Sequence, residues 1–186
     1  YKPEYISVTY GAGGGNVGAN RQVCRMVRNA GTVPVTHFTV IRNTKQGIRE
    51  QLETYLKEGV DHILALRGDF PRGETSTGGD FNYATDLVKF IRDEFGEQFE
   101  IAVAGSPEGH ISCRSLEADI GVLKMKQDNG ADYIMTQLCW DMEQFERWLD
   151  KIRRAGVTLP VDVGIMPILD QAATINMALS RNGCVM

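Results

Sequence analysis

The stretch that decides the fold is "PVTHFTVIRNTKQGIREQLETYLKEGVDHILALRGD", residues 34–69. Its two ends, "PVTHFTVI" (34–41) and "HILALRG" (62–68), are short apolar runs rich in Val, Ile and Thr, which predicts buried strands. Between them, Leu52, Tyr55 and Leu56 recur at helical spacing, and Gly59 stands where a glycine commonly ends a helix. A strand, a helix and a second strand in this order predict two parallel strands joined by a helical crossover.

The same alternation continues on both sides of this stretch. Further strands are predicted at 5–10, 99–105, 132–138 and 160–168, and helices at about 17–30, 44–58, 81–95, 114–129, 141–155 and 170–182. Asp141 is the predicted N-cap of its helix, and Gly130 and Gly156 are predicted to end theirs. Six βα units fit either a doubly wound sheet or a (β/α)8 barrel. A complete barrel takes roughly 250 residues, so we expect one domain, 1–186, that is a partial (β/α)8 TIM-type barrel of about six units.

Composition excludes several classes of protein. The chain is 42% hydrophobic and 24% charged with a net charge of −4, which argues against a nucleic-acid binder. Neither a membrane span nor a signal peptide is recognisable, so we expect a cytoplasmic location. The cysteines lack metal-ligand spacing, which predicts reduced thiols and no metal site; they are Cys24, Cys113, Cys139 and Cys184. The first residue is Tyr1, and the last ones follow directly on a helix-ending Asn-Gly, which suggests a trimmed chain.

The segment 5–49 contains no acidic residue. Its arginines either lie on solvated helix faces or form a basic approach to an anionic ligand. Within it, Gly13, Gly15 and Gly18 spell the G-x-G-x-x-G pattern of dinucleotide-binding loops. Such a loop needs an acidic residue about 20 residues on, and none is present. Arg42 would suit a 2′-phosphate instead, so an NADP-binding Rossmann-type oxidoreductase domain stays open as an alternative. The other interpretation is a mobile loop over the mouth of a barrel.

Polar residues recur where successive predicted strands end. In both architectures the active site lies at this edge of the sheet, so a shared pocket is expected. Each residue also has a structural alternative: His37 would suit the core, and Arg67 and Asp69 would suit an ion pair. The residues at the strand ends are Thr9, Thr36, His37, Arg67, Gly68, Asp69, Ser106, His110, Thr136 and Gln137.

Several segments carry a family resemblance. In chain order, "SVTYGAGG", "LALRGDFPRG", "PEGH", "LKMKQDNGADYIMTQ" and "GIMPI" resemble the methylenetetrahydrofolate reductase family, from about residue 3 to residue 169. The resemblance implies a barrel that carries FAD and reduces 5,10-methylenetetrahydrofolate to 5-methyltetrahydrofolate with hydride from NAD(P)H, in the one-carbon metabolism that serves methionine biosynthesis. It also implies a homo-oligomer or an electron-donating partner subunit. A barrel that binds flavin or folate without catalysis remains the non-enzymatic alternative.

The resemblance also implies roles for individual residues. Asp69 and Gln137 would be catalytic and would contact the folate. Asp69 would also contact the cofactor, together with eleven further positions, of which the last three would bind its ribose and phosphates. The cofactor-binding residues would be Thr9, His37, Leu66, Arg67, Gly68, Asp69, Tyr83, Ala84, Ser106, His110, Asp119 and Lys126.

This sequence departs from the family at several points. Ser106 replaces a usual tyrosine, and the glycine run replaces a "Gly-Ser/Thr-x-Arg-Asp" loop. The Phe-Glu-Phe-Phe-Pro-Pro-like segment with the acidic glutamate is not found, and we expect the first and last barrel strands to lie outside this chain.

Overall fold

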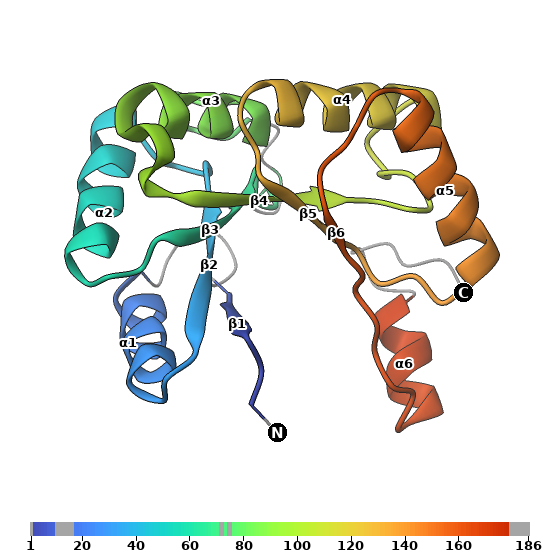
Figure 1. The fold of residues 1–186 in the computed structure, drawn as a ribbon, viewed down its shortest axis with the longest axis horizontal. Helices are drawn as coiled ribbons and strands as arrows, with labels where there is room; N and C mark the ends of the chain where they lie inside the picture. Colours follow the sequence, from blue (N-terminus) through green and yellow to red (C-terminus); the bar gives the residue numbers. More distant parts are fainter. Residues whose placement is uncertain (1, 10–16, 71–72, 74–75, 179–186) are drawn as a thin grey trace. The chain divides into compact units, whose positions relative to one another are not determined.

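The computed structural model describes residues 2–9, 17–70, 73 and 76–178 (Figure 1). The glycines Gly13 and Gly15 of the G-x-G-x-x-G pattern lie outside the described residues, as does Cys184. The chain folds as two compact units, Tyr1–Val103 and Ala104–Met186. The organisation of 1–186 as one domain stays a prediction.

The first unit is built around parallel strands that follow one another in chain order. Its strands are β1 (Tyr5–Val8), β2 (Val33–Thr39), β3 (His62–Leu66) and β4 (Glu100–Gly105), the last of which runs across the unit boundary. Each pairs in parallel with the next. The helices α1 (Val17–Asn29), α2 (Lys45–Lys57) and α3 (Ala84–Phe95) alternate with them, and a short 3-10 helix, Gly96–Gln98, precedes β4. The crossover predicted for 34–69 is therefore confirmed.

The strand order decides between the two architectures. A doubly wound sheet reverses its strand order at a switch point, whereas the order here is β1-β2-β3-β4-β5-β6, which follows the chain. Six βα units in this sequential parallel order are those of a partial (β/α)8 barrel. The doubly wound alternative is wrong, and with it the fold on which the Rossmann interpretation depended.

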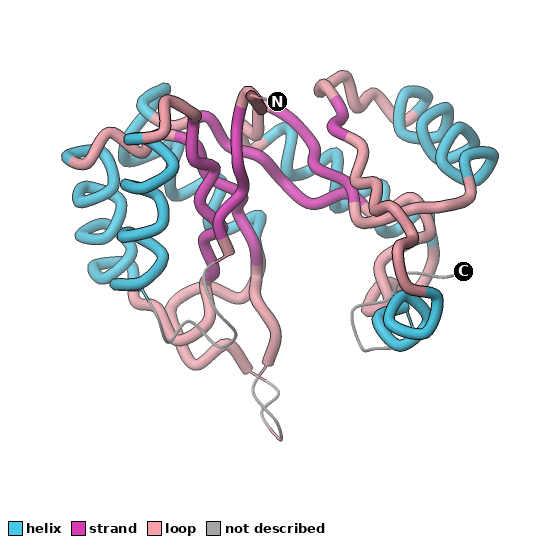
Figure 2. Tube along the Cα trace, turned by 90° about the horizontal axis from the view of Figure 1, so that it is seen from below, coloured by secondary structure: helices cyan, strands magenta, loops and turns pink. Residues whose placement is uncertain are grey.

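One face of the first unit's sheet packs against its helices. Register places Val8 of β1, Thr36 of β2 and Ile63 of β3 side by side on this face, and all three are buried. Figure 2 shows α1 and α2 on one side of these strands. On α2, Tyr55 is fully buried, and its ring meets that of Phe38 edge-on with centroids 6.2 Å apart. Because side chains alternate along a strand, the residues next to these three point to the opposite face of the sheet.

The second unit contains α4 (Leu116–Asp128), β5 (Tyr133–Thr136), α5 (Met142–Arg154), β6 (Val161–Asp162) and α6 (Gln171–Ala178), and β5 pairs in parallel with β6. Asp141 caps α5 as predicted, because its carboxylate accepts a hydrogen bond from the backbone N–H of Gln144 at 3.0 Å. Gly130 and Gly156 have φ of 103° and 81°, the backbone conformation of a glycine that ends a helix.

Several predicted elements are shorter in the structure, and in two of them side-chain hydrogen bonds account for the difference. The strand expected at 160–168 is only Val161–Asp162. Beyond it the backbone N–H of Gly164 donates to the Thr136 hydroxyl at 2.9 Å, so a side chain replaces the next ladder contact. The helix expected from 81 begins at Ala84, because the carboxylate of Asp86 accepts hydrogen bonds from the backbone N–H groups of Asn82 and Tyr83. No helix among the described residues is long and apolar enough to cross a membrane.

Candidate functional site

Thr9 and His37 follow directly on the last pair of the β1–β2 register, which joins Val8 to Thr36. Thr9 lies just beyond β1, and His37 alternates with Thr36 on β2, so it belongs to the opposite face of the first unit's sheet. His37 in turn pairs with Leu64 of β3. Thr9 is exposed and His37 is half-buried. Burial lowers the pKa of His37, so its imidazole is neutral at pH 7 and offers one donor and one acceptor.

The end of β3 turns sharply at Gly68. Its φ is 86°, and a Cβ there would lie 2.8 Å from Cγ1 of Ile41 and 3.1 Å from Cβ of Thr39. A residue with a side chain would meet both steric obstacles at once. Only glycine therefore lets the backbone after Leu66 pass this close to the end of β2.

Arg67 and Asp69 flank this glycine but do not form the ion pair considered as their structural alternative. Among the described residues, the guanidinium of Arg67 stacks on the ring of Phe70 and its Nε donates to the Gly68 carbonyl at 3.3 Å, with no ion pair to Asp69. Asp69 is exposed. The turn therefore presents a cation and a carboxylate separately, each available to a ligand.

Thr39, at the end of β2, has a buried side-chain hydroxyl. Within the described part of the chain, its hydroxyl oxygen is buried and has no hydrogen-bond partner. Buried hydroxyls nearly always have one. Its backbone carbonyl accepts from the Asn43 side chain at 3.0 Å, so the strand end itself is held in place. An orphaned hydroxyl beside a glycine turn is the kind of group that a bound polar molecule satisfies.

Tyr83 and Ala84 stand at the N-terminus of α3. Tyr83 is 63% exposed and Ala84 is half-buried. The N-terminus of a helix favours negatively charged ligands. Here Asp86 already accepts the N–H groups of Asn82 and Tyr83 at 3.0 and 2.9 Å. The exposed phenol ring of Tyr83 is therefore the more accessible binding element.

In the second unit, Asp119 organises the loop between β4 and α4. Its carboxylate accepts hydrogen bonds from the backbone N–H of His110 at 3.2 Å and from the thiol of Cys113 at 3.5 Å. The backbone N–H of Ser112 donates to Nδ1 of His110 at 3.1 Å, which leaves the Nε2–H of a neutral ring as a donor. Burial, followed by the charge of Asp119, raises the pKa of Cys113. The thiol is thus held protonated as a donor to Asp119.

Lys126 lies on the same face of α4, seven residues after Asp119. Its Nζ donates to the Ala104 carbonyl of β4 at 2.9 Å. Burial lowers the pKa of Lys126, and the nearby Asp119 opposes that shift. Ser106 is half-buried and its carbonyl accepts from Gly109 N–H at 2.9 Å, which closes the first turn of the loop. The structure therefore brings these predicted residues together around one loop.

Gln137 follows β5 directly. Its backbone N–H donates to the Gly105 carbonyl at 2.8 Å, and its side chain is exposed. Thr136 uses its hydroxyl to accept from Gly164 N–H. Gln137 is therefore fixed by its backbone at the carboxyl end of β5, and its side chain reaches the surface.

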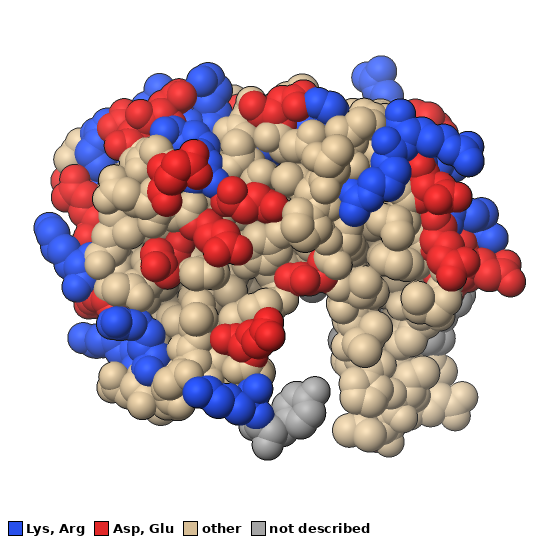
Figure 3. Space-filling model, in the orientation of Figure 1, with Lys and Arg blue, Asp and Glu red and all other residues tan. Residues whose placement is uncertain are grey.

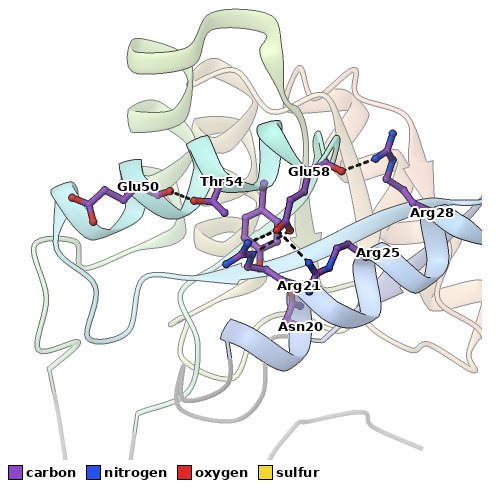
Figure 4. A network of polar contacts seen from close by, with 8 residues as sticks. Asn20, Arg21, Arg25, Arg28, Glu50, Thr54 and Glu58 are labelled. Atoms are coloured by element: carbon purple, nitrogen blue, oxygen red, sulfur yellow. Dashed lines mark hydrogen bonds and ion pairs between the residues drawn. The ribbon is translucent and has the colours of Figure 1, made fainter.

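The basic segment is paired rather than presented to a ligand. Arg21 and Arg25 both contact the carboxylate of Glu58 at the end of α2 (Figure 4), and Arg49 contacts Glu94 at 2.9 Å. Figure 3 shows acidic and basic side chains interspersed over α2 and α3. For these arginines the solvated-helix interpretation holds. Among the described residues no group of three or more His, Cys, Asp and Glu side chains forms a metal site.

The structure adds two residues that sequence reasoning did not select. They are Asn20 and Phe70, each in contact with a predicted site residue. From the sequence, Thr39 stands out only as a polar residue at a strand end. Asn20 had a detectable signal, because it lies at helical spacing from the buried residues Cys24 and Val27 and is a polar residue in that stripe. Phe70 gave none, since its role depends on turn geometry.

Comparison with known proteins gives consistent results. The family model described as Methylenetetrahydrofolate reductase matches residues 1–181. Methylenetetrahydrofolate reductase 2 of Saccharomyces cerevisiae is 37% identical over 183 residues, which cover 95% of this chain and 30% of the yeast protein. Methylenetetrahydrofolate reductase (NADH) 1 of Arabidopsis thaliana is 35% identical over 96% of this chain and 32% of its own length.

A shorter bacterial relative matches equally well. The 5,10-methylenetetrahydrofolate reductase of Salmonella typhimurium is 36% identical over 90% of this chain and 55% of its own length. This chain thus spans about a third to a half of the relatives it matches. Among solved structures, 2,3-dimethylmalate lyase, a member of the PEP mutase/isocitrate lyase superfamily, aligns over 92% of this chain and 70% of its own with a TM-score of 0.53 and 11% identity, a likeness of fold alone.

Proposed function

Because the chain belongs to the methylenetetrahydrofolate reductase family, we propose that it forms the flavin-binding part of an enzyme that reduces 5,10-methylenetetrahydrofolate to 5-methyltetrahydrofolate. FAD would supply the chemistry of accepting a hydride from NAD(P)H and delivering it to the methylene carbon of the folate. The Arabidopsis relative is named for NADH, which favours NADH as the donor.

The observation that carries this proposal is the turn at Gly68. Its positive φ and the close approach of Ile41 and Thr39 leave no room for a Cβ, so the end of β3 carries bare backbone at this turn, and the partnerless Thr39 hydroxyl lies beside it. Bare backbone next to a partnerless hydroxyl suits the close approach of a flat polar molecule such as a flavin. Arg67 and the backbone at Gly68 would hold its oxygens, because guanidinium and backbone N–H groups are donors suited to them.

The face of the first unit's sheet to which His37 belongs would hold the rest of the ring. Thr9 offers a hydroxyl and neutral His37 offers a donor and an acceptor, so neither brings a charge that would compete with Asp69. Leu66, half-buried at the end of β3, would give apolar contact, as would Ala84. Tyr83 would add an aromatic surface at the start of α3.

Asp69 would act electrostatically. An exposed carboxylate directly after Gly68 places negative charge where the reacting atoms would lie. That charge stabilises a cationic form of the folate's reacting nitrogen–carbon unit and disfavours further negative charge beside it. Gln137 has an exposed side chain that ends in an amide, and an amide is a chemical group suited to the polar edge of the pterin. These two residues would therefore bind and orient the substrate.

The loop between β4 and α4 would take the nucleotide end of the cofactor. His110 would donate from Nε2, Asp119 would accept from ribose hydroxyls, and Lys126 would face phosphate oxygens. Ser106 would offer a hydroxyl in place of the family's aromatic contact.

Two measurements on the purified full-length protein, which includes the barrel strands expected outside this chain, would test the proposal. Flavin absorption bands that co-purify with it, and oxidation of methyltetrahydrofolate with menadione as acceptor, are the expected results. Asp69→Asn should keep the flavin bands and lose most of the turnover. Flavin bound without turnover would favour the non-catalytic barrel, and a colourless protein that fails to bind added FAD would overturn the proposal.

A further inference from the structure

Asn20 is a buried polar residue of α1 whose contacts converge on the end of β1. It is 3% exposed. Its side-chain Nδ2 donates to the carbonyl oxygens of Val8 at 3.2 Å and Thr9 at 3.0 Å. The paired register of β1 with β2 ends at Val8 and Thr36. The amide of Asn20 therefore binds the strand at the point where its backbone ladder ends.

The other end of the Asn20 amide is held just as firmly. Its Oδ1 accepts hydrogen bonds from the hydroxyl of Thr36 at 3.0 Å and from that of Tyr55 at 2.6 Å, and the thiol of Cys24 approaches to 3.6 Å. Thr36 comes from β2 and Tyr55 from α2, and both are fully buried. Both atoms of the amide are thus satisfied, and a fully satisfied buried network rigidifies its members.

Arginines on the surface of α1 attach this helix to the end of α2. Arg21 and Arg25 point toward Glu58, and Arg28 donates to the Glu58 carbonyl at 2.6 Å (Figure 4). α1 is therefore anchored to the end of α2 by charges on its surface and by Tyr55 in its interior. Because α1 is anchored in this way, the position of the Asn20 side chain is fixed relative to β1 and α2.

We propose that Asn20 is a positioning residue for the cofactor site, acting through Thr9. This inference rests on the proposed function. Val8 is buried, whereas Thr9, which directly follows β1, is exposed. The hydrogen bond from Asn20 to the Thr9 carbonyl holds the backbone of this residue, and with it the direction in which the Thr9 hydroxyl extends. Asn20 never touches the cofactor, yet it determines where one of the cofactor's contacts stands.

Two substitutions can test separately the hydrogen bonds that Asn20 makes to β1 and the one that it accepts from α2. Asn20→Asp keeps the Oδ1 acceptor for Thr36 and Tyr55, and in its ionised form it has no proton to donate to the Val8 and Thr9 carbonyls. Tyr55→Phe removes a hydrogen bond of the same amide on the α2 side and leaves the strand contacts intact. A purely structural network predicts that both changes act through stability alone. A positioning role predicts that only the first changes cofactor affinity at matched stability.

The experiment measures the FAD dissociation constant by quenching of flavin fluorescence, together with the melting temperature without FAD. The full chain is used, at a temperature where each variant is folded. Asn20→Asp is expected to weaken FAD binding tenfold or more, and Tyr55→Phe to change it less than twofold while lowering the melting temperature. If Asn20→Asp does not fold, Asn20→Ser replaces it, because the short side chain removes the carbonyl contacts without burying a charge.

Each remaining outcome is decisive. FAD affinity within twofold of the unchanged protein in the Asn20 variant overturns the positioning role and leaves the proposed function intact. Equal losses in the Asn20 and Tyr55 variants overturn it as well, in favour of a structural network. An unchanged protein that binds no FAD overturns both this inference and the proposed function.

Discussion

The guanidinium carbon of Arg67 lies 4.6 Å from the centroid of the Phe70 ring. The two residues bracket Gly68 and Asp69, so the stacking closes the turn that follows β3. A long arginine side chain has many rotamers, and an aromatic face selects the one in which it stacks. Such a contact contributes about 0.5–1 kcal/mol at an exposed site. Phe70 is 36% exposed, which places it in that class.

We predict that Phe70→Leu weakens FAD binding because it releases Arg67 from its stacked position. The energy above corresponds to about a two- to fivefold rise in the dissociation constant, measurable by fluorescence titration. Phe70→Tyr keeps the ring and is the matched control, expected to bind FAD as the unchanged protein does. If leucine and tyrosine give the same affinity, the ring does not position Arg67.

The Gly68 turn gives a second prediction, on stability. Gly68→Ala should lower the free energy of unfolding by roughly 2 kcal/mol or more, because a positive φ costs about 1–2 kcal/mol and overpacking adds about 1–3 kcal/mol. Gly73 has nearly the same φ, 85°, and no atom of the described residues lies within 4 Å of its Cβ position. Gly73→Ala should therefore cost only the backbone part. Urea unfolding of both variants measures the difference, and equal losses would refute a steric role for Ile41 and Thr39.

Most of the fold could be read from the sequence because its signals are local. Apolar β-branched runs, helical spacing and glycines such as Gly59, with φ of 69°, each act within a few residues. The alternation of elements then restricts the topology. What local signals could not decide was barrel against doubly wound sheet, since both use the same βα units and differ only in which strands pair. Strand pairing connects residues far apart in sequence. The structure shows which strands pair, for example β1 with β2 and β2 with β3.

The candidate site was predictable as a set of strand ends but not as a set of contacts. The sequence placed Thr9 and His37 at the ends of successive strands, and both follow directly on the last pair of the β1–β2 register, Val8 with Thr36. It gave no sign that Asn20, 11 residues further on, holds the Thr9 carbonyl. It also suggested an Arg67–Asp69 pair where the structure has Arg67 on Phe70. Side-chain partners depend on turn geometry, which the residue types alone do not specify.

His37 gives a prediction on pH. Burial lowers its pKa in the folded state, whereas in the unfolded chain it titrates near its ordinary value of about 6.5. Below that pH the imidazole is protonated in the unfolded state but still neutral in the folded state. The free energy of unfolding therefore falls as the solution is acidified from about 6.5 toward the folded pKa. His37→Gln should remove this part of the acid-side loss in urea unfolding from pH 7 to 5.

A second histidine serves as the control for that slope. His62 contacts the carboxylates of Asp61 at 2.8 Å and Glu100 at 3.0 Å, at the opposite ends of the strands. His62→Gln should leave the loss attributed to His37 in place. The assignment to His37 fails if its replacement leaves the pH profile unchanged.

Glu58 gives a prediction on the anchorage of α1. The hydrogen bond from Arg21 lowers the pKa of Glu58, so its contribution to stability is present above its unfolded pKa of about 4.3 and is lost as pH falls through the folded pKa. Glu58→Gln should cost about 0.5–1 kcal/mol at pH 7, the upper range for a partly exposed ion pair. Glu53→Gln is the control, because Glu53 meets Lys57 only at 4.0 Å on an exposed face. A loss at Glu53 as large as that at Glu58 would contradict the anchorage.

Lys126 separates a structural role from a ligand-binding one. Burial lowers its pKa, so its charge is costly in the fold, while its hydrogen bond to the Ala104 carbonyl offsets part of that cost. Lys126→Met removes both, and the two effects oppose each other, so we expect the free energy of unfolding to change by no more than about 1 kcal/mol.

FAD affinity should respond differently to the same change. If Lys126 faces phosphate oxygens, Lys126→Met should raise the FAD dissociation constant about tenfold or more, since hydrogen bonds to charged groups contribute about 1.5–3 kcal/mol. Lys124→Met, which removes the ion pair with Asp128 on the same helix, should leave the affinity unchanged. Should the two variants bind FAD equally well, Lys126 serves only to tie α4 to the Ala104 carbonyl of β4.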